Sequence, residues 1–286
     1  MTISKLLITG ATALKEAGID NAAKEVELFL SHILQVKRLD LYLNSNNQVT
    51  GNNISLFNSF IARRIKREPV AYITGFQDFM ELSFKVNRNV LIPRPETELL
   101  AEHTLALIDK KVPGYEILDL ATGSGILAIT LKKKFPFVRM TASDISAGAL
   151  AVAKENAKKH GVFAEITFLE SNMFKGLKKG KKFHLIVSNP PYVPKEDMKI
   201  LMEDVRLFEP KTALDGGKEG LRFYKEVIKK APLYLHSSGY LALEIGFGQA
   251  EKIRNLFNES GKFDILKLVR DYAAIERVLI ARVKNG

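Results

Sequence analysis

The chain has 286 residues, 46% of them apolar, and a formal net charge of +11. This length and composition are typical of a globular protein with one large core and a smaller one, and the absence of cysteine excludes a disulfide framework, an iron–sulfur cluster and cysteine-ligated zinc. No apolar run approaches the roughly 18 residues of a membrane helix, and the start of the chain lacks the basic and then apolar pattern of a signal peptide. We therefore expect a cytoplasmic protein without a membrane partner.

Residues 1–71 carry a helical pattern. Apolar side chains recur at spacings of three and four residues, the periodicity of a helix with one buried face. The recurring positions are Ala22, Ala23, Val26, Phe29, Leu30, Ile33, Leu34, Phe57, Phe60, Ile61 and Ile65. We predict a small helical bundle without a cluster of catalytic residue types, whose role is either structural or the docking of a partner. Positive charge near the end of its last helix suits the helix dipole and is supplied by Arg63, Arg64, Lys66 and Arg67.

Residues 72–92 predict a β-hairpin that links this bundle to the rest of the chain. Pro69 ends the preceding helix, and large apolar residues then lie between polar turns. Pro95 suits the first turn of a new helix that runs to about Lys111. We therefore assign 93–286 to a second domain.

Strand and helix patterns alternate in this second domain. The predicted strands are 117–120, 138–142, 166–169, 183–187, 240–245, 263–269 and 275–283. The predicted helices among them are 126–134, 146–161, 221–231 and 249–257. Alternation of this kind predicts an α/β fold with a mainly parallel sheet covered on both faces. We expect seven strands with an antiparallel last pair.

The first two strand ends point to a nucleoside-type cofactor. Ligands of such sheets bind at the carboxyl ends of the strands, and 119–125 forms a tight glycine-containing turn there that lets the backbone approach a ligand. The turn matches neither a Walker loop nor the G-x-G-x-x-G pattern. Asp144 ends the second strand about 20 residues further on, where a carboxylate can accept both hydroxyls of a ribose.

The third and fourth strand ends extend this prediction. The third strand ends at Ser171-Asn172-Met173-Phe174, where a polar side chain can bond to an adenine amino group and Met173 or Phe174 can pack on the ring. The fourth strand stops at Asn189-Pro190-Pro191-Tyr192, where the Asn189 side-chain oxygen and the Pro190 carbonyl can accept both hydrogens of a planar NH₂ group. Tyr192 can cover the flat face of that group. An adenosine cofactor beside a nucleophilic nitrogen is therefore predicted.

The chain resembles Rossmann-type S-adenosylmethionine-dependent methyltransferases, and more closely the bacterial release factor glutamine methyltransferase family. The general class is carried by 119–125, Asp144 and 189–192. The closer match is carried by five further segments, which are Arg67–Gly75, Leu91–Glu98, Phe208–Pro210, Ala213–Gly217 and Gly220–Leu221. Together these segments extend over nearly the whole chain.

The resemblance implies a seven-stranded Rossmann-like methyltransferase sheet joined by the β-hairpin to an N-terminal bundle that docks release factors. It implies transfer of a methyl group from S-adenosylmethionine to the side-chain amide nitrogen of the glutamine in the Gly-Gly-Gln motif of peptide-chain release factors. The implied cofactor-binding residues are Ala121, Thr122, Gly123, Ser124, Gly125, Asp144, Asn172, Met173 and Asn189. The implied catalytic residues are Asn189, Pro190 and Tyr192, and these three bind the substrate glutamine together with Pro191.

Two positions depart from the family pattern. Ala121 stands where the family usually has glycine, and Asn172-Met173 stands where it usually has aspartate and an aromatic residue. Because asparagine can still accept from an adenine amine and methionine can pack on its ring, we expect altered cofactor affinity with retained activity.

A mechanism follows from the clamp. An amide nitrogen is a poor nucleophile because its lone pair is delocalised into the carbonyl. Acceptors at Asn189 and Pro190 orient this nitrogen and stabilise the positive charge that grows on it. The reaction needs no strong base, and the five histidines are scattered without ligand spacing, so we expect no metal.

Two alternatives stay open. The Asn-Pro-Pro-Tyr pattern is shared with RNA and DNA adenine amino-methyltransferases, and a net charge of +11 favours anionic partners. The other is a non-catalytic ribosome or release-factor binding protein. We interpret the basic runs Lys132–Lys134 and Lys178–Lys182 as solvated helix ends or loops, and expect a monomer that binds release factors and no nucleic acid stably.

Overall fold

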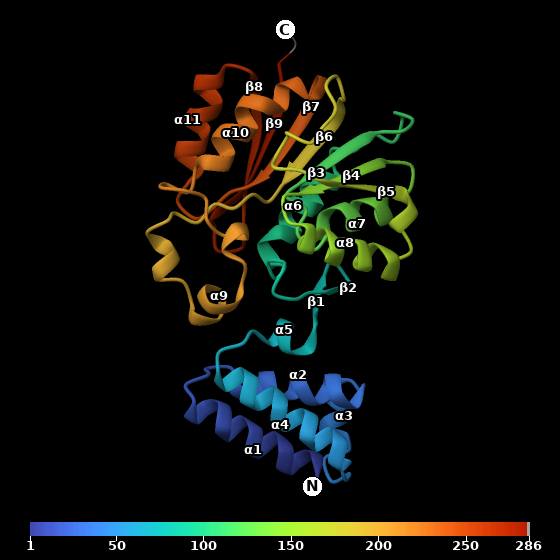
Figure 1. Ribbon diagram of the computed structural model, residues 1–286, viewed down its shortest axis with the longest axis vertical. Helices are drawn as coiled ribbons and strands as arrows, with labels where there is room; N and C mark the ends of the chain where they lie inside the picture. Colours follow the sequence, from blue (N-terminus) through green and yellow to red (C-terminus); the bar gives the residue numbers. More distant parts are fainter. Residues whose placement is uncertain (285–286) are drawn as a thin grey trace. The chain divides into compact units, whose positions relative to one another are not determined.

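The computed structural model describes residues 1–284, which form two compact units (Figure 1). The first unit comprises Met1–Gly75 and Met202–Phe208, and the second comprises Phe76–Leu201 and the chain from Glu209 onward. Within the described residues, no helix combines the length and the apolar character needed to cross a bilayer.

The first unit is a helical bundle. Its helices are α1 (Ile3–Glu16), α2 (Ala22–Leu34), α3 (Arg38–Leu43), α4 (Gly51–Ile65), α5 (Val70–Thr74) and α9 (Glu203–Phe208). Helices α1 and α4 begin at threonine caps, where Thr2 Oγ1 accepts from Lys5 N at 3.3 Å and Thr50 Oγ1 from Asn53 N at 3.4 Å. Most of the apolar positions predicted to repeat form its core, with Val26, Phe29 and Leu30 fully buried, whereas Ala23 and Ile65 are exposed. The predicted bundle is thus built from one buried face per helix.

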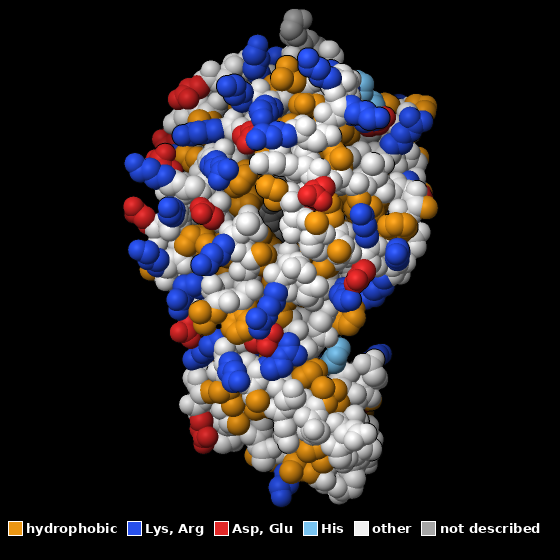
Figure 2. All heavy atoms as spheres, viewed as in Figure 1, with side chains coloured by type: hydrophobic (Ala, Val, Ile, Leu, Met, Phe, Trp, Pro, Cys, Tyr) orange, Lys and Arg blue, Asp and Glu red, His pale blue; other side chains and the backbone are white. Residues whose placement is uncertain are grey.

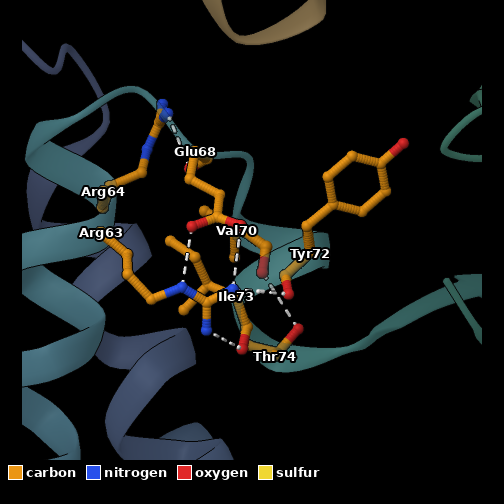
Figure 3. A network of polar contacts seen from close by, with 7 residues as sticks. All are labelled: Arg63, Arg64, Glu68, Val70, Tyr72, Ile73 and Thr74. Carbon is orange, nitrogen blue, oxygen red and sulfur yellow. Dashed lines mark hydrogen bonds and ion pairs between the residues drawn. The ribbon is translucent and has the colours of Figure 1, made fainter. Parts of the chain in front are cut away.

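Arg63 ties α5 to the end of α4 (Figure 3). Its guanidinium forms a two-pronged ion pair with Glu68, with Nε–Oε2 and Nη2–Oε1 distances of 2.8 and 3.0 Å. The same group donates to the carbonyls of Tyr72 and Ile73, at 3.1 and 3.3 Å, in the last turn of α5. Since helix-end carbonyls lack partners within the helix, Arg63 serves as a side-chain cap for α5. The segment 67–75, which carries the resemblance, therefore has a structural role, because its residues Glu68, Tyr72 and Ile73 are the partners of Arg63.

The other basic residues at this helix end also have partners inside the first unit. Arg64 Nε lies 2.7 Å from Glu25 Oε2, and both side chains are largely buried. Arg67 donates to the carbonyls of Ala17 and Gly18, each at 3.0 Å. The positive charge of this helix end is therefore mostly committed to internal contacts.

The second unit is built on a mixed sheet whose strand order is β5-β4-β3-β6-β7-β9-β8. The strands are β3 (Glu116–Leu120), β4 (Arg139–Asp144), β5 (Ile166–Glu170), β6 (Phe183–Ser188), β7 (Leu235–Glu244), β8 (Phe263–Arg270) and β9 (Glu276–Val283). The first five are parallel, and β9 pairs antiparallel with both β7 and β8. The predicted α/β fold with seven strands and an antiparallel last pair is confirmed.

Helices cover both faces of this sheet (Figure 1). They are α6 (Pro95–Leu105), α7 (Ile126–Lys134), α8 (Ala147–Lys159), α10 (Arg222–Lys230) and α11 (Ala250–Ser260), with short 3₁₀ turns at Phe163–Glu165, Asp197–Lys199, Lys211–Ala213 and Ala231–Leu233. One core lies between the sheet and α6, α7 and α8, and a second lies between the opposite face and α10 and α11. Strand residues alternate between them, so that Leu185 and Val187 face the first and Ile186 the second. Helix α6 starts at Pro95 as predicted but stops at Leu105 rather than near Lys111. After Leu105 the backbone forms tighter bonds to the carbonyl three residues earlier, from Leu107 N to Thr104 O at 3.0 Å and from Ile108 N to Leu105 O at 3.3 Å.

The hairpin β1 (Phe76–Phe79) and β2 (Leu82–Lys85) groups with the second unit. Asn156 of α8, which is fully buried, accepts from Lys85 N at 2.7 Å and donates to Lys85 O at 3.0 Å. The segment 72–92, predicted as one linker, is therefore divided, because its first residues belong to α5 and the rest packs as part of the sheet domain.

Candidate active site

A cavity of about 330 Å³ opens at the carboxyl ends of four neighbouring parallel strands in the second unit. Its wall includes residues that follow β3, β4, β5 and β6 in the chain. Among the predicted cofactor-binding residues, those on the wall are Ala121, Thr122, Gly123, Ser124, Asp144, Asn172, Met173 and Asn189. Residues from four separate stretches of the sequence thus meet at one place, which is the position expected for a ligand of such a sheet.

Gly125 lies behind the wall and shapes the turn after β3. Its φ of +84° is a conformation that glycine adopts without strain, and a Cβ added there would lie 3.0 Å from Ile129 and 3.1 Å from Ala153. Asn156 Nδ2 holds the same turn by donating to Ser124 O at 2.9 Å. Gly125 therefore acts on the cavity through backbone shape and close helix packing.

Ala121 has a φ of +62°, in the left-handed region where a Cβ is unfavourable. This gives a physical reason why the family usually has glycine at this position. Ala121→Gly is expected to raise the free energy of unfolding by about 1 kcal/mol. Ala151→Gly, on the exposed face of α8, is expected to lower it by about the same amount. Urea denaturation of both variants measures this, and equal signs for the two changes would contradict the strain at Ala121.

Asp144 presents its carboxylate at the end of β4. Gly123 N donates to Oδ2 and Ser146 N to Oδ1, each at 2.9 Å, so the carboxylate is held by the backbone on both sides of the cavity floor. Burial raises the pKa of this carboxyl, and the backbone donors at Ser146 and Gly123 oppose that shift. Each oxygen keeps a second lone-pair direction, which suits acceptance of ribose hydroxyls.

A second acidic residue, Asp119, lies beneath the glycine turn and is fully buried. Its Oδ2 accepts from Thr122 Oγ1 at 2.5 Å and from Ala128 N at 3.0 Å, while Oδ1 has no hydrogen-bond partner within the described chain. Burial raises its pKa to about 7, against those two hydrogen bonds. Asp119 therefore fixes the turn from below and does not itself line the cavity.

The turn after β5 supplies an apolar side of the cavity. Met173 is buried at a φ of +51°, and the Ser171 hydroxyl holds this turn by donating to Met173 O at 2.6 Å and accepting from Gly176 N at 2.8 Å. Ile145 and Leu127 line the cavity as well. Together with Asp144 and Asn172, this combination of apolar and polar wall residues fits an adenosine group.

The loop after β6 is held by close backbone packing. Ser188 Oγ donates to Leu120 O at 2.5 Å, and Gln249 Nε2 donates to Tyr192 O at 2.9 Å. A Cβ added at Gly216 would lie 2.7 Å from Tyr192 Cα, and one at Gly220 would lie 2.2 Å from Tyr192 O. Only glycine fits beside this loop at both places, which gives a structural reason for the segments around 213–217 and 220–221 in the resemblance.

Within this loop, Asn189 and Pro191 line the cavity, whereas Pro190 and Tyr192 lie outside its wall. Tyr192 packs against the second core and its hydroxyl donates to Glu244 Oε1 at 3.2 Å. The structure thus gives the Tyr192 hydroxyl a supporting contact, and the position of its ring over a ligand group stays a prediction. Burial and the neighbouring Glu244 charge raise the pKa of the Tyr192 hydroxyl well above its usual range, which keeps it a hydrogen-bond donor.

Two stretches of the wall were not predicted. One runs from Asn89 to Thr97 and the other from Lys211 to Phe223, and both overlap segments that carry the resemblance. Thr97 contacts Asn189 directly, since Asn189 Nδ2 donates to Thr97 Oγ1 at 3.2 Å. The available signal in the sequence was a threonine two residues after Pro95, in the first turn of the predicted helix.

Basic side chains do not gather into one patch on the face shown in Figure 2. Lys and Arg are spread over this face of the second unit, with Asp and Glu among them. At the cavity itself, Lys211, Arg94 and Arg222 contribute positive charge, and Arg94 is paired with Glu209 at 2.5 Å. Basic side chains therefore line the cavity, but they do not form a continuous basic patch on the face shown.

Comparison with known proteins gives matches along the chain. The model described as PrmC N-terminal domain matches residues 5–75, and that described as methyltransferase small domain matches residues 95–215. A release factor glutamine methyltransferase of Geobacter sulfurreducens is 39% identical over 283 residues, 99% of this chain and 97% of that one. Another, of Chlorobaculum tepidum, is 37% identical over 285 residues, 97% and 96% of the two chains. A solved methyltransferase from Pyrococcus furiosus has a TM-score of 0.53 at 18% identity, with coverage of 82% and 100%, which shows similarity of fold.

Proposed function

The chain belongs to the release factor glutamine methyltransferase family, and we propose that it methylates the side-chain amide nitrogen of the glutamine in the Gly-Gly-Gln motif of peptide-chain release factors, using S-adenosylmethionine. The observation that carries the proposal is Asn189, whose amide lies on the wall of the same cavity as Asp144 and the glycine turn. A proposed acceptor for the substrate nitrogen and a proposed cofactor site therefore face one space. The reaction tunes translation termination, and this substrate places the enzyme in the cytoplasm.

The donor set of the cavity fits S-adenosylmethionine. Asp144 would accept the ribose hydroxyls, Asn172 would accept from the adenine amine, and Met173 would pack on the adenine ring. The open space beside Gly123, where a Cβ would meet nothing within 4 Å, leaves room for a ligand close to the backbone. When bound, this cofactor supplies an electrophilic methyl group on a sulfonium centre.

The chain's own groups orient the substrate. Asn189 Oδ1, on the cavity wall, would accept one hydrogen of the glutamine amide. The carbonyl of Pro190, which follows Asn189 in the loop although the Pro190 residue does not itself line the cavity, would accept the other. Together the two acceptors would fix the plane of the amide and stabilise positive charge on its nitrogen. The proton that leaves the methylated nitrogen goes to solvent, and no base in the chain is required.

We assign release-factor docking to the helical bundle, also as a proposal. Leu39 and Leu43 lie one turn apart on α3 and are 67% and 73% exposed, and Ile8 of α1 is 65% exposed. Exposed large apolar side chains of this kind are suited to a protein partner. We expect the enzyme to act as a monomer without a stably bound nucleic acid.

Labelled S-adenosylmethionine tests the function directly. Incubated separately with a release factor, ribosomal RNA and DNA, the protein is expected to label the release factor alone. A release factor whose Gly-Gly-Gln glutamine is replaced by alanine is the matched control and is expected to take no label. Label in RNA or DNA would favour an adenine amino-methyltransferase, and label in none of the three would favour a non-catalytic binding protein.

A further inference from the structure

Behind Asn189 lies a chain of buried hydrogen bonds that ends at a carboxylate. Asn189 Nδ2 lies 3.2 Å from Thr97 Oγ1, and Thr97 Oγ1 lies 2.7 Å from Glu244 Oε2. The other carboxylate oxygen, Oε1, accepts from the Tyr192 hydroxyl at 3.2 Å. Three elements distant in sequence, namely α6, the β6 loop and the end of β7, are linked in this way.

These groups are shielded from solvent. Thr97 and Glu244 are each 1% exposed. A buried hydroxyl has one hydrogen to donate, and its partners decide where that hydrogen points. Because these groups are buried, bulk water cannot easily replace their hydrogen-bond partners and so reverse the donor and acceptor roles along the chain.

The number of hydrogens that Thr97 and Glu244 can donate decides which group is the donor in each hydrogen bond of this chain. The ionised Glu244 carboxylate only accepts, so the single hydrogen of the Thr97 hydroxyl is donated to it. The Thr97 oxygen must then accept from Asn189, and only the NH₂ side of that amide can donate. The Asn189 carbonyl oxygen is consequently the atom left to face the cavity, where an acceptor is required.

We propose that Thr97 and Glu244 are positioning residues that fix the Asn189 amide with its oxygen toward the substrate nitrogen. This inference rests on the proposed function and deepens it. In the flipped orientation, the Asn189 NH₂ would meet the substrate NH₂, donor against donor, and the clamp would fail.

Protonation of Glu244 would reverse the chain. A neutral carboxylic acid can donate to Thr97 Oγ1, which frees the Thr97 hydrogen to point at Asn189 and favours the flipped amide. Burial raises the pKa of Glu244 to about 7. Hydrogen bonds from the Thr97 and Tyr192 hydroxyls to the Glu244 carboxylate lower this pKa. The charge of Glu96 raises it, and the charge of Arg277 lowers it. The Tyr224 hydroxyl donates to the Glu244 backbone carbonyl at 2.9 Å.

Substitution of Thr97 separates positioning from packing. Thr97→Val keeps the shape and removes both hydrogen bonds, so kcat for release-factor methylation is expected to fall about 10-fold or more, with KM and the Kd of S-adenosylmethionine within about twofold. Thr97→Ser keeps the hydroxyl and is expected to restore kcat to within about threefold. Thr104→Val is the matched control, because Thr104 lies two turns further along α6, is equally buried, and has a hydroxyl with no partner within the described chain. A kcat for Thr97→Val equal to that of Thr104→Val would overturn the proposal.

The pH profile tests Glu244 without depending on a stable variant. For the wild type, kcat is expected to be about 10-fold lower at pH 6 than at pH 8, because the ionised fraction of a group with a pKa near 7 changes by that factor. Glu244→Gln cannot titrate, so its kcat is expected to be low and to differ less than about twofold between the two pH values. A pH-independent wild-type kcat would contradict the role of Glu244.

The orientation can also be measured without activity. Nuclear Overhauser contacts between the Asn189 side-chain NH₂ and the Thr97 methyl group are expected at pH 8 and are expected to weaken at pH 6. If these contacts are present while the wild type methylates no release factor, the proposed function fails and the orientation stands. If methylation occurs and the contacts are absent at pH 8, the orientation fails and the proposed function stands.

Discussion

Asn189→Ala is expected to lower kcat for methylation of a release factor by about 100- to 1,000-fold, the cost typical of removing a group that stabilises developing charge at a reacting centre. The alanine variant keeps the backbone of the β6 loop, which is fixed by Ser188 and Gln249. It loses the acceptor that orients the amide nitrogen. The Kd of S-adenosylmethionine is expected to change by less than about fivefold, because the ribose and adenine contacts are made by other strand ends.

Single-turnover methylation and isothermal titration with the cofactor measure the two effects separately. Asn255→Ala, on the exposed face of α11, is the matched control and is expected to leave both values unchanged. Near-normal turnover by the Asn189 variant would show that the clamp is not needed for the reaction. Loss of cofactor binding equal to the loss of turnover would instead make Asn189 a cofactor ligand alone.

Asp144→Ala is expected to raise the Kd of S-adenosylmethionine about 100-fold. The carboxylate is proposed to accept two ribose hydroxyls, and hydrogen bonds to a charged group contribute about 1.5–3 kcal/mol each to binding. The same substitution removes the acceptor for Gly123 N and Ser146 N, so the glycine turn also loses support. With the cofactor at saturating concentration, kcat is expected to recover to within about threefold of the wild type.

Asp144→Asn separates these two contributions. The amide oxygen can still accept from one backbone N–H, so the turn is expected to hold better than in the alanine variant, while the Kd of the cofactor is still expected to rise about 10-fold. Asp197→Ala, at an exposed residue of a 3₁₀ turn, serves as the control for loss of an acidic residue. An unchanged Kd in both Asp144 variants would exclude the ribose contact.

Much of the fold could be predicted because its signals are local. Apolar periodicity placed the strands, a glycine turn marked the end of the first and a pair of prolines the end of the fourth, so Asp144 and Asn189 were expected at one sheet edge before any contact was known. The end of α6 was predicted too late, since the chain leaves the helix at Leu105 through tighter backbone bonds that no glycine or proline in the sequence marks. Local patterns thus predict where an element lies better than where it stops.

The support behind the site could not be predicted in the same way. Thr97 and Glu244 lie 147 positions apart and meet because α6 packs over the end of β7. The hydrogen bond from the Tyr192 hydroxyl to the buried carboxylate of Glu244 was likewise not predicted. Such contacts depend on the order of the strands in the sheet, and a single sequence does not reveal that order.

The basic runs show that the sequence alone also does not decide whether a charged side chain is exposed or buried. Lys132 was interpreted as part of a solvated helix end, yet it is 6% exposed and donates to the carbonyls of Pro136 and Val138 at 2.5 and 3.0 Å. The interpretation of Lys132 was therefore wrong. A lysine stem can lie along the core while its ammonium caps the chain before the next strand, and composition alone does not distinguish this from a solvated charge.

The hydrogen bonds from Asn189 to Glu244 determine when, during synthesis of the chain, the site becomes complete. Synthesis proceeds from the N-terminus, so the ribosome exposes the cofactor-facing strand ends and Asn189 well before Glu244 and Gln249. A nascent chain that stops short of β7 has the residues of the cavity wall but neither the carboxylate that directs the Asn189 amide nor the glutamine that holds Tyr192. The enzyme therefore acquires its directed clamp only when about the last quarter of the second unit, from β7 onward, has left the ribosome and joined the sheet.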